Sequence, residues 1–232
     1  MHLGKSSKII LFIVEGITDE ISLGLILSKI IEKDKAVRFK VVGGDITSQN
    51  GVNTSNILTK ITKVINEFIE KDIYRKSDIL KVVHLVDIDG TFISDDLILE
   101  KDVENIEYTT ENIYAKNIEK IKARNKQKSQ ILNKLATSST VYTNLPYEVY
   151  FFSCNLEHVL HNELNVADDV KEKYAYKFAD KYVGNPSDFI DFINNPEFAL
   201  TGQHKETWEF IRKGANSLNR YTNFNLYIES LK

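Results

Sequence analysis

Several features that the sequence lacks narrow what the protein can be. It holds a single cysteine, Cys154, which excludes an internal disulfide framework and fits a reducing, cytoplasmic compartment. No apolar run approaches the roughly 20 residues that a membrane-spanning helix needs, so we expect no membrane segment. The chain has 30 Lys and Arg against 33 Asp and Glu and a formal net charge of −3, so no global positive field indicates a nucleic-acid partner. No internal repeat and no Walker A motif occur in it.

The composition that is present is typical of a globular protein. With 42% hydrophobic and 27% charged residues in 232, the chain can bury a substantial core. Basic residues precede the first apolar segment, but Glu15 interrupts that segment and no small-residue cleavage site follows it. We therefore expect no signal peptide.

Two apolar, β-branched segments end in carboxylates beside a glycine. The first, 9–14, runs into Glu15, and the second, 80–87, ends at Asp87 and is followed by Asp89. This pattern indicates buried parallel strands. Because the carboxyl ends of parallel strands meet at one edge of a sheet, where α/β proteins place their chemistry, we expect the three carboxylates to converge there.

Hydrophobic periodicity predicts the remaining elements, and the alternation of strands with helices predicts a mostly parallel sheet flanked by helices. We expect a first region at 1–165 that contains a charged, helical insertion at about 94–140, followed by a helical C-terminal extension at 166–232. The predicted strands are 9–14, 37–42, 80–87 and 147–154, and the predicted helices are 17–33, 55–71 and 111–135.

The two acidic motifs together resemble the Toprim domain of topoisomerases, primases, OLD-family nucleases and the small Toprim ribonucleases. In that family a Glu-Gly pair ends the first strand and an Asp-x-Asp motif ends a later one, as Glu15 and Gly16 and then Asp87 and Asp89 do here. Glu157 matches a late Glu segment of OLD-type and defence-associated Toprim proteins, although the two residues after it depart from the pattern. The resemblance implies a Toprim-like α/β fold and a metal-dependent nuclease that cleaves RNA or DNA in a prokaryotic or phage-defence setting.

The resemblance also implies roles for these side chains. Asp87 and Asp89 would hold Mg²⁺ or Mn²⁺, with Glu157 as a further ligand. Glu15 would either complete the coordination or manage the proton of the attacking water or leaving oxygen. The physical need is that a phosphodiester is anionic and its transition state more so, and a hard cation with oxygen ligands offsets that charge. The residues expected to line the site beside these ligands are Gly16, Asp19 and Gly90.

Simpler accounts exist for some of these acids. Asp19 and Glu157 fall at the starts of predicted helices, where the helix dipole alone favours a carboxylate. The segment 87–91 also resembles the first motif of haloacid-dehalogenase-type phosphatases, in which the first Asp is a nucleophile and the second a general acid. That motif normally opens the chain and leaves Glu15 without a role, so this interpretation ranks second. A third hypothesis is a Toprim interaction module without catalytic activity.

Phosphate binding by an acidic chain has to come from local basic clusters. The densest cluster is the segment 116–128, on the insertion expected to overhang the site, although a solvated helix face explains the same residues. The resemblance further implies a separate ATPase subunit as a partner, and a homo-oligomer stays open. The residues expected to contact nucleic acid are Lys122, Arg124, Lys126, Arg212, Lys213 and Arg220.

Overall fold

The computed structural model of this chain describes residues 8–31 and 34–231. The predicted end of the first helix at 32–33 lies outside the described residues. So do residues 1–7, on which the signal-peptide expectation partly rests.

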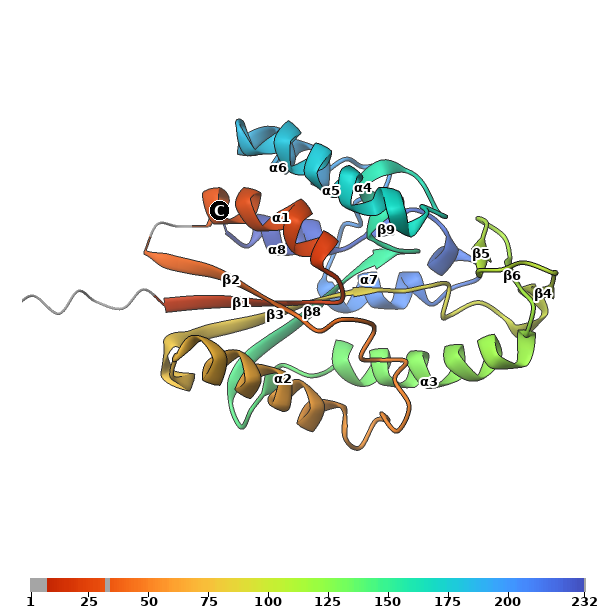
Figure 1. Cartoon of the computed structure of the whole chain (residues 1–232), viewed down its shortest axis with the longest axis horizontal. Coiled ribbons are helices and arrows are strands. Elements are labelled where there is room, and N and C mark those ends of the chain that lie inside the picture. Colours follow the sequence, from red (N-terminus) through yellow and green to blue (C-terminus); the bar gives the residue numbers. More distant parts are fainter. Residues whose placement is uncertain (1–7, 32–33, 232) are drawn as a thin grey trace, which may run out of the picture.

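A mostly parallel sheet forms the centre of the molecule (Figure 1), and the predicted α/β fold class is confirmed. Each predicted strand is present with ends that lie within two residues of the expected ones. The parallel strands follow the order β2 (Lys35–Val41), β1 (Lys8–Val14), β3 (Ile79–Asp87) and β8 (Leu145–Ser153), while β7 (Thr140–Val141) and β9 (Tyr221–Thr222) pair antiparallel with β8.

Helices cover both faces of this sheet, which explains why its central strands are continuously apolar. Alternate residues of β1 enter opposite cores: Leu11 packs with the first helical layer, and Phe12 packs with the second. The first layer consists of α2 (Ile57–Asp72), α3 (Ile118–Ala136) and α7 (His204–Ile211). The second consists of α1 (Ile17–Ile30), α4 (Leu156–His161), α5 (Asp168–Val183), α6 (Pro186–Ile193) and α8 (Phe224–Glu229).

The insertion differs from its prediction, because short strands precede its helix. The helix was expected from residue 111, but α3 begins at Ile118, where the Asn117 side chain caps it by accepting a hydrogen bond from the Lys120 amide at 2.9 Å. The preceding residues form a small separate sheet of β4 (Ile98–Glu100), β5 (Glu107–Tyr108) and β6 (Ile113–Ala115). Short 3₁₀ helices lie at η1 (Lys76–Asp78), η2 (Asp95–Leu97) and η3 (Asn216–Leu218).

The C-terminal extension packs directly on the sheet. Its helices are present as predicted, together with strand β9, in which Thr222 pairs with Phe152 of β8. Trp208 and Ile211 contribute to the first core, and Phe189 contributes to the second. No helix in the described part of the chain is long and apolar enough to cross a membrane.

Candidate active site at the carboxyl edge of the sheet

Glu15 and Asp87 meet because their strands are neighbours. Strands β1 and β3 run parallel, with Ile13 opposite His84, so both chains reach the same edge of the sheet together. The Asp87 amide donates a hydrogen bond to Glu15 Oε1 at 3.3 Å. The structure thus brings together two of the acids that the sequence singled out.

The loop after Asp87 is held in a fixed shape that presents Asp89. The Cys154 carbonyl, at the end of β8, accepts hydrogen bonds from the Ile88 amide at 3.0 Å and the Asp89 amide at 2.7 Å. Asp89 and Gly90 both have left-handed backbones, with φ of 53° and 64°. A Cβ on Gly90 would lie 2.5 Å from Leu218 Cδ2, so any other residue would have to displace that side chain and adopt a left-handed backbone, both of which favour glycine.

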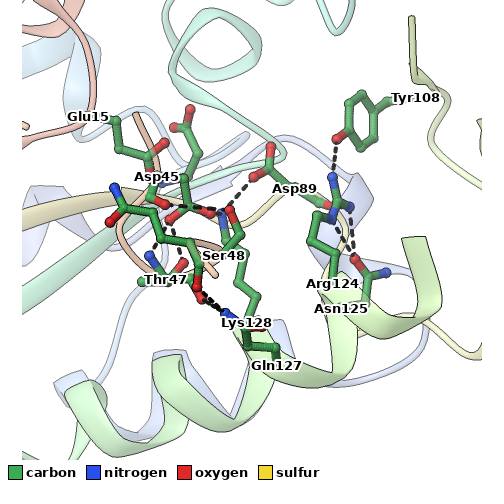
Figure 2. Close-up of polar contacts among 12 residues, drawn as sticks. Glu15, Asp45, Thr47, Ser48, Asp89, Tyr108, Arg124, Asn125, Gln127 and Lys128 are labelled. Carbon is green, nitrogen blue, oxygen red and sulfur yellow. Dashed lines mark hydrogen bonds and ion pairs between the residues drawn. The ribbon is translucent and has the colours of Figure 1, made fainter. Parts of the chain in front are cut away.

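A buried ammonium, Lys128 on α3, lies between two carboxylates (Figure 2). Its Nζ is 2.8 Å from Asp45 Oδ2 and 2.6 Å from Asp89 Oδ2, and its side chain is 0% exposed. Thr47 donates to Asp45 from its amide at 2.7 Å and from its hydroxyl at 2.5 Å. Lys128 therefore ties the loop after β2 to the loop after β3.

The pKa values of this ion-paired group follow from burial and charge. Burial favours the neutral form of Asp45, but the Lys128 ammonium and its hydrogen bond outweigh burial and hold the pKa of Asp45 well below its ordinary value. Burial likewise opposes the charged form of Lys128, yet the carboxylates of Asp89 and Asp45 raise its pKa well above the usual range. Asp45 and Lys128 are therefore both charged at neutral pH and form a buried ion pair.

Glu15 and Asp87 behave differently from Asp45. Burial raises the pKa of Glu15 well above its ordinary value, against the opposing ammonium of Lys128, and repulsion from Asp45 and Asp89 adds to the rise. Burial also raises the pKa of Asp87, and the Glu15 carboxylate adds repulsion. The edge of the sheet therefore carries more carboxylates than Lys128 can offset, and it would gain stability from a further cation.

Asp19 lies against Glu15 from the start of α1. Its Oδ2 accepts hydrogen bonds from the Glu15 amide at 3.1 Å and the Gly16 amide at 3.0 Å, so it fixes the turn that carries Glu15. Burial raises the pKa of Asp19 to about 6, in spite of these bonds, and the Glu157 carboxylate also raises it. Glu157 itself is only 9% exposed on α4, and its charge acts on Asp87 as well.

The residues expected to contact nucleic acid lie in different surroundings. The Arg124 guanidinium donates to the Asp89 carbonyl at 2.9 Å and to the Tyr108 hydroxyl at 2.9 Å, so it holds the loop after β3 (Figure 2). Arg220 donates from Nε and Nη2 to the Val159 carbonyl at 3.1 and 2.7 Å. Lys122 pairs with Glu119, Lys126 and Lys213 are exposed, and Arg212 lies over the rings of Phe92 and Trp208.

Sequence reasoning missed the roles of Asp45 and Lys128. Asp45 follows a strand and two glycines, which is the same local pattern that identified the other acids. Lys128 was grouped with the basic surface cluster, and that placement is wrong because the side chain is fully buried. Its burial could have been predicted from its position on α3, because it lies at helical spacing among the buried residues of that helix. The buried residues of α3 are Ile121, Asn125, Lys128, Ile131, Leu132 and Leu135.

The donor chemistry of this edge suits a hard divalent cation. Glu15, Asp87 and Asp89 offer carboxylate oxygens, which Mg²⁺ and Mn²⁺ prefer over nitrogen or sulfur. Among the described residues, no set of three or more His, Cys, Asp or Glu side chains is arranged so that it could hold a metal ion. Asp89 Oδ2 contacts Lys128, so its other carboxylate oxygen is the one that suits a cation.

Comparisons of this chain with protein-family models, with curated proteins and with solved structures found no match. The resemblance to Toprim proteins therefore stays a prediction that rests on the residues themselves.

Proposed function

We propose that this protein is a metal-dependent nuclease of the Toprim type that cleaves phosphodiester bonds of RNA or DNA. The observation that carries the proposal is that Glu15 and Asp87 meet at the carboxyl edge of β1 and β3, with the Asp89 charge acting on both. The half-buried carboxylates there exceed the positive charge beside them. That arrangement suits a reaction in which a cation and an anionic phosphate come together.

Within this proposal each side chain has a distinct task. Asp87 and Asp89 would hold Mg²⁺ or Mn²⁺, which when bound would offset the charge of the phosphate and lower the pKa of a bound water. Glu15, whose pKa is raised by burial, suits the transfer of a proton to or from the reacting oxygen. Lys128 is fully buried, so it would position Asp89 rather than touch the substrate.

The partners proposed here follow from the same assignment. Nucleic acid is the proposed substrate, in a prokaryotic or phage-defence role in the cytoplasm, with a separate ATPase subunit as a proposed partner. The chain has no global positive charge, so the nucleic-acid ligand is proposed from the cation that Glu15, Asp87 and Asp89 would hold.

The test is cleavage of labelled RNA and DNA oligonucleotides with Mg²⁺ or Mn²⁺ by the wild type and by Glu15→Gln and Asp87→Asn variants. We expect both substitutions to reduce cleavage by at least about 100-fold, as loss of a catalytic acid–base group typically does. Glu70→Gln, an exposed position on α2, makes the same change of charge and serves as the matched control. Equal cleavage by all of these preparations would refute the proposal.

The phosphatase interpretation predicts a different outcome. If Asp87 were a nucleophile, a phosphorylated small molecule would transfer a phosphoryl group to its carboxylate, and mass spectrometry would locate that group on Asp87. Glu15→Gln would then stay fully active. We expect no phosphorylated Asp87, and we expect Glu15→Gln to lose most of its cleavage of oligonucleotides.

A further inference from the structure

The carboxyl edge of the sheet that carries Glu15, Asp87 and Asp89 is called the acidic edge below. A cavity of about 600 Å³ lies beside it. Thr91 and Phe92 line it from the loop that follows Gly90, Asn125 and Lys126 line it from α3, and Arg212 lines it from the end of α7. Asn125 Nδ2 also donates to the Gly90 carbonyl at 3.4 Å. The cavity therefore begins at the same loop that presents Asp89.

Two buried polar atoms in the cavity wall have no hydrogen-bond partner among the described residues. One is Oγ1 of Thr91, a residue that is only 3% exposed, and the other is Nε of Arg212. Buried polar groups are nearly always hydrogen-bonded, because an unmade bond costs the full loss of hydration. The wall of one cavity therefore holds two polar atoms without a protein partner, whose bonds a bound group or an ordered water would complete.

The charges around the cavity favour an anion. Arg212 makes no hydrogen bond or ion pair within the part of the chain that the structure describes, and its guanidinium lies 5.9 Å from the ring centres of both Phe92 and Trp208. The Glu209 carboxylate is near enough to act on it electrostatically. The Lys126 ammonium is likewise without a described partner. The other charged residues of the lining are Lys122, which pairs with Glu119 at 2.8 Å, Glu119 itself, and Asp95, which is exposed.

We propose that this cavity binds a phosphate group of a nucleic-acid strand whose neighbouring phosphodiester lies at Asp87 and Asp89. This inference rests on the proposed function. A phosphate offers several acceptor oxygens, which match a hydroxyl, a guanidinium Nε and an ammonium that are all donors. The cavity exceeds the size of one phosphate, so it has room for part of the adjoining sugar. Contacts of this kind fix the register of a strand without selecting its sequence.

The test measures binding of a fluorescent oligonucleotide in EDTA, which separates binding from cleavage. We expect Arg212→Met to weaken binding by about tenfold or more, as the loss of a charge-assisted hydrogen bond does, and to reduce the slope of log affinity against log salt by about one. Arg75→Met is the matched control, because Arg75 is an exposed residue just before strand β3, at the opposite edge of the sheet. It should bind like the wild type.

Thr91→Val gives a second, independent readout. The valine keeps the shape of the side chain and removes a hydroxyl that has no partner, so we expect unfolding in urea to show equal or greater stability, together with weaker oligonucleotide binding. A less stable Thr91→Val protein would show that the hydroxyl has a structural role and would overturn this part of the inference.

Other outcomes separate the cavity from the proposed function. Equal affinity of the wild type, Arg212→Met, Thr91→Val and Arg75→Met would refute the cavity as a strand-binding site. Stabilisation of the wild type by inorganic phosphate, without Arg212-dependent binding of the oligonucleotide, would assign the cavity to a free phosphate instead. Hydrolysis of a small diester, bis(p-nitrophenyl) phosphate, that is the same in the wild type and Glu15→Gln would refute the proposed function while leaving the binding results to stand.

Discussion

Lys128 is the residue on which the geometry of the acidic edge depends most. Removing one partner of a buried ion pair leaves the other charge without compensation, at a cost of about 3–5 kcal/mol. We expect Lys128→Met to lower the free energy of unfolding by about 3 kcal/mol, because Asp45 and Asp89 both lose their ammonium partner. Urea unfolding measures this, with Lys134→Met, exposed on the same helix, as the control. Equal stability of the two variants would contradict the assigned role.

Asp19 gives the acidic edge a pH dependence. Burial raises its pKa from 3.8 to about 6, so the folded protein binds a proton that the unfolded chain releases between these values. The stabilisation from this group is complete below about pH 4 and is lost as the pH rises through about 6. Asp19→Asn cannot lose a proton, and its oxygen can still accept from the backbone amides. The variant should therefore gain stability relative to the wild type, by up to about 3 kcal/mol between pH 4 and pH 7.

Thermal or urea unfolding in EDTA at several pH values checks this expectation. A difference between Asp19→Asn and the wild type that stays constant with pH would show that the Asp19 carboxyl titrates alike in the folded and unfolded chains.

At the level of single residues, the acids could be identified from the sequence, but the buried ammonium of Lys128 that pairs with them could not. Glu15, Asp87 and Asp89 were predictable because an acid at the end of an apolar strand is a local pattern. Lys128 is paired with residues 39 and 83 positions away in the chain, and pairing over such separations depends on how the insertion folds back onto the sheet. Neither partner can be identified from the residues that flank Lys128.

At the level of elements, the end of α2 carries a strained residue. Ile73 has a left-handed backbone, with φ of 59° and ψ of 36°, and it is 92% exposed. Glycine is the residue that this position favours, because a β-branched side chain is rarely accommodated there. We expect Ile73→Gly to raise the free energy of unfolding by about 1 kcal/mol.

Ile73→Ala separates backbone strain from the removal of an exposed apolar side chain. Alanine keeps a Cβ, so it should gain less than glycine does in the same thermal unfolding experiment. A larger gain from alanine would show that relief of backbone strain is not the cause.

The element predictions succeeded where periodicity was strong and failed where it was absent. The main strands have 7 to 9 residues, and their positions were predictable because β1, β3 and β8 are mostly apolar and β2 alternates between apolar and charged residues. Strands β4, β5 and β6 have only 2 or 3 residues each, which is too short to show any period. Their pairing with one another shifted the start of α3 by about two turns of helix.

At the level of the whole molecule, the C-terminal extension should unfold together with the sheet. Trp208 is the single tryptophan of the chain, and it lies on α7 within the first core, against Phe151 of β8. Its fluorescence therefore reports on the extension, while circular dichroism reports on all helices and strands. We expect the two signals to follow one transition in urea, as for a single cooperative unit. Two separate midpoints would instead make residues 166–232 an independent domain.

The order of the strands has a consequence for synthesis on the ribosome. Strand β3 pairs with β1 on one side and with β8 on the other, and β8 begins only at residue 145. Until that residue has left the exit tunnel, one edge of β3 has no partner and its apolar side chains stay in water. The carboxylates of Glu15 and Asp45 also precede Lys128 in the chain, so they emerge before their counter-charge does. Such non-local pairing is slow. The nascent chain therefore exposes the unpaired edge and the apolar side chains of β3, to which chaperones would bind while translation continues.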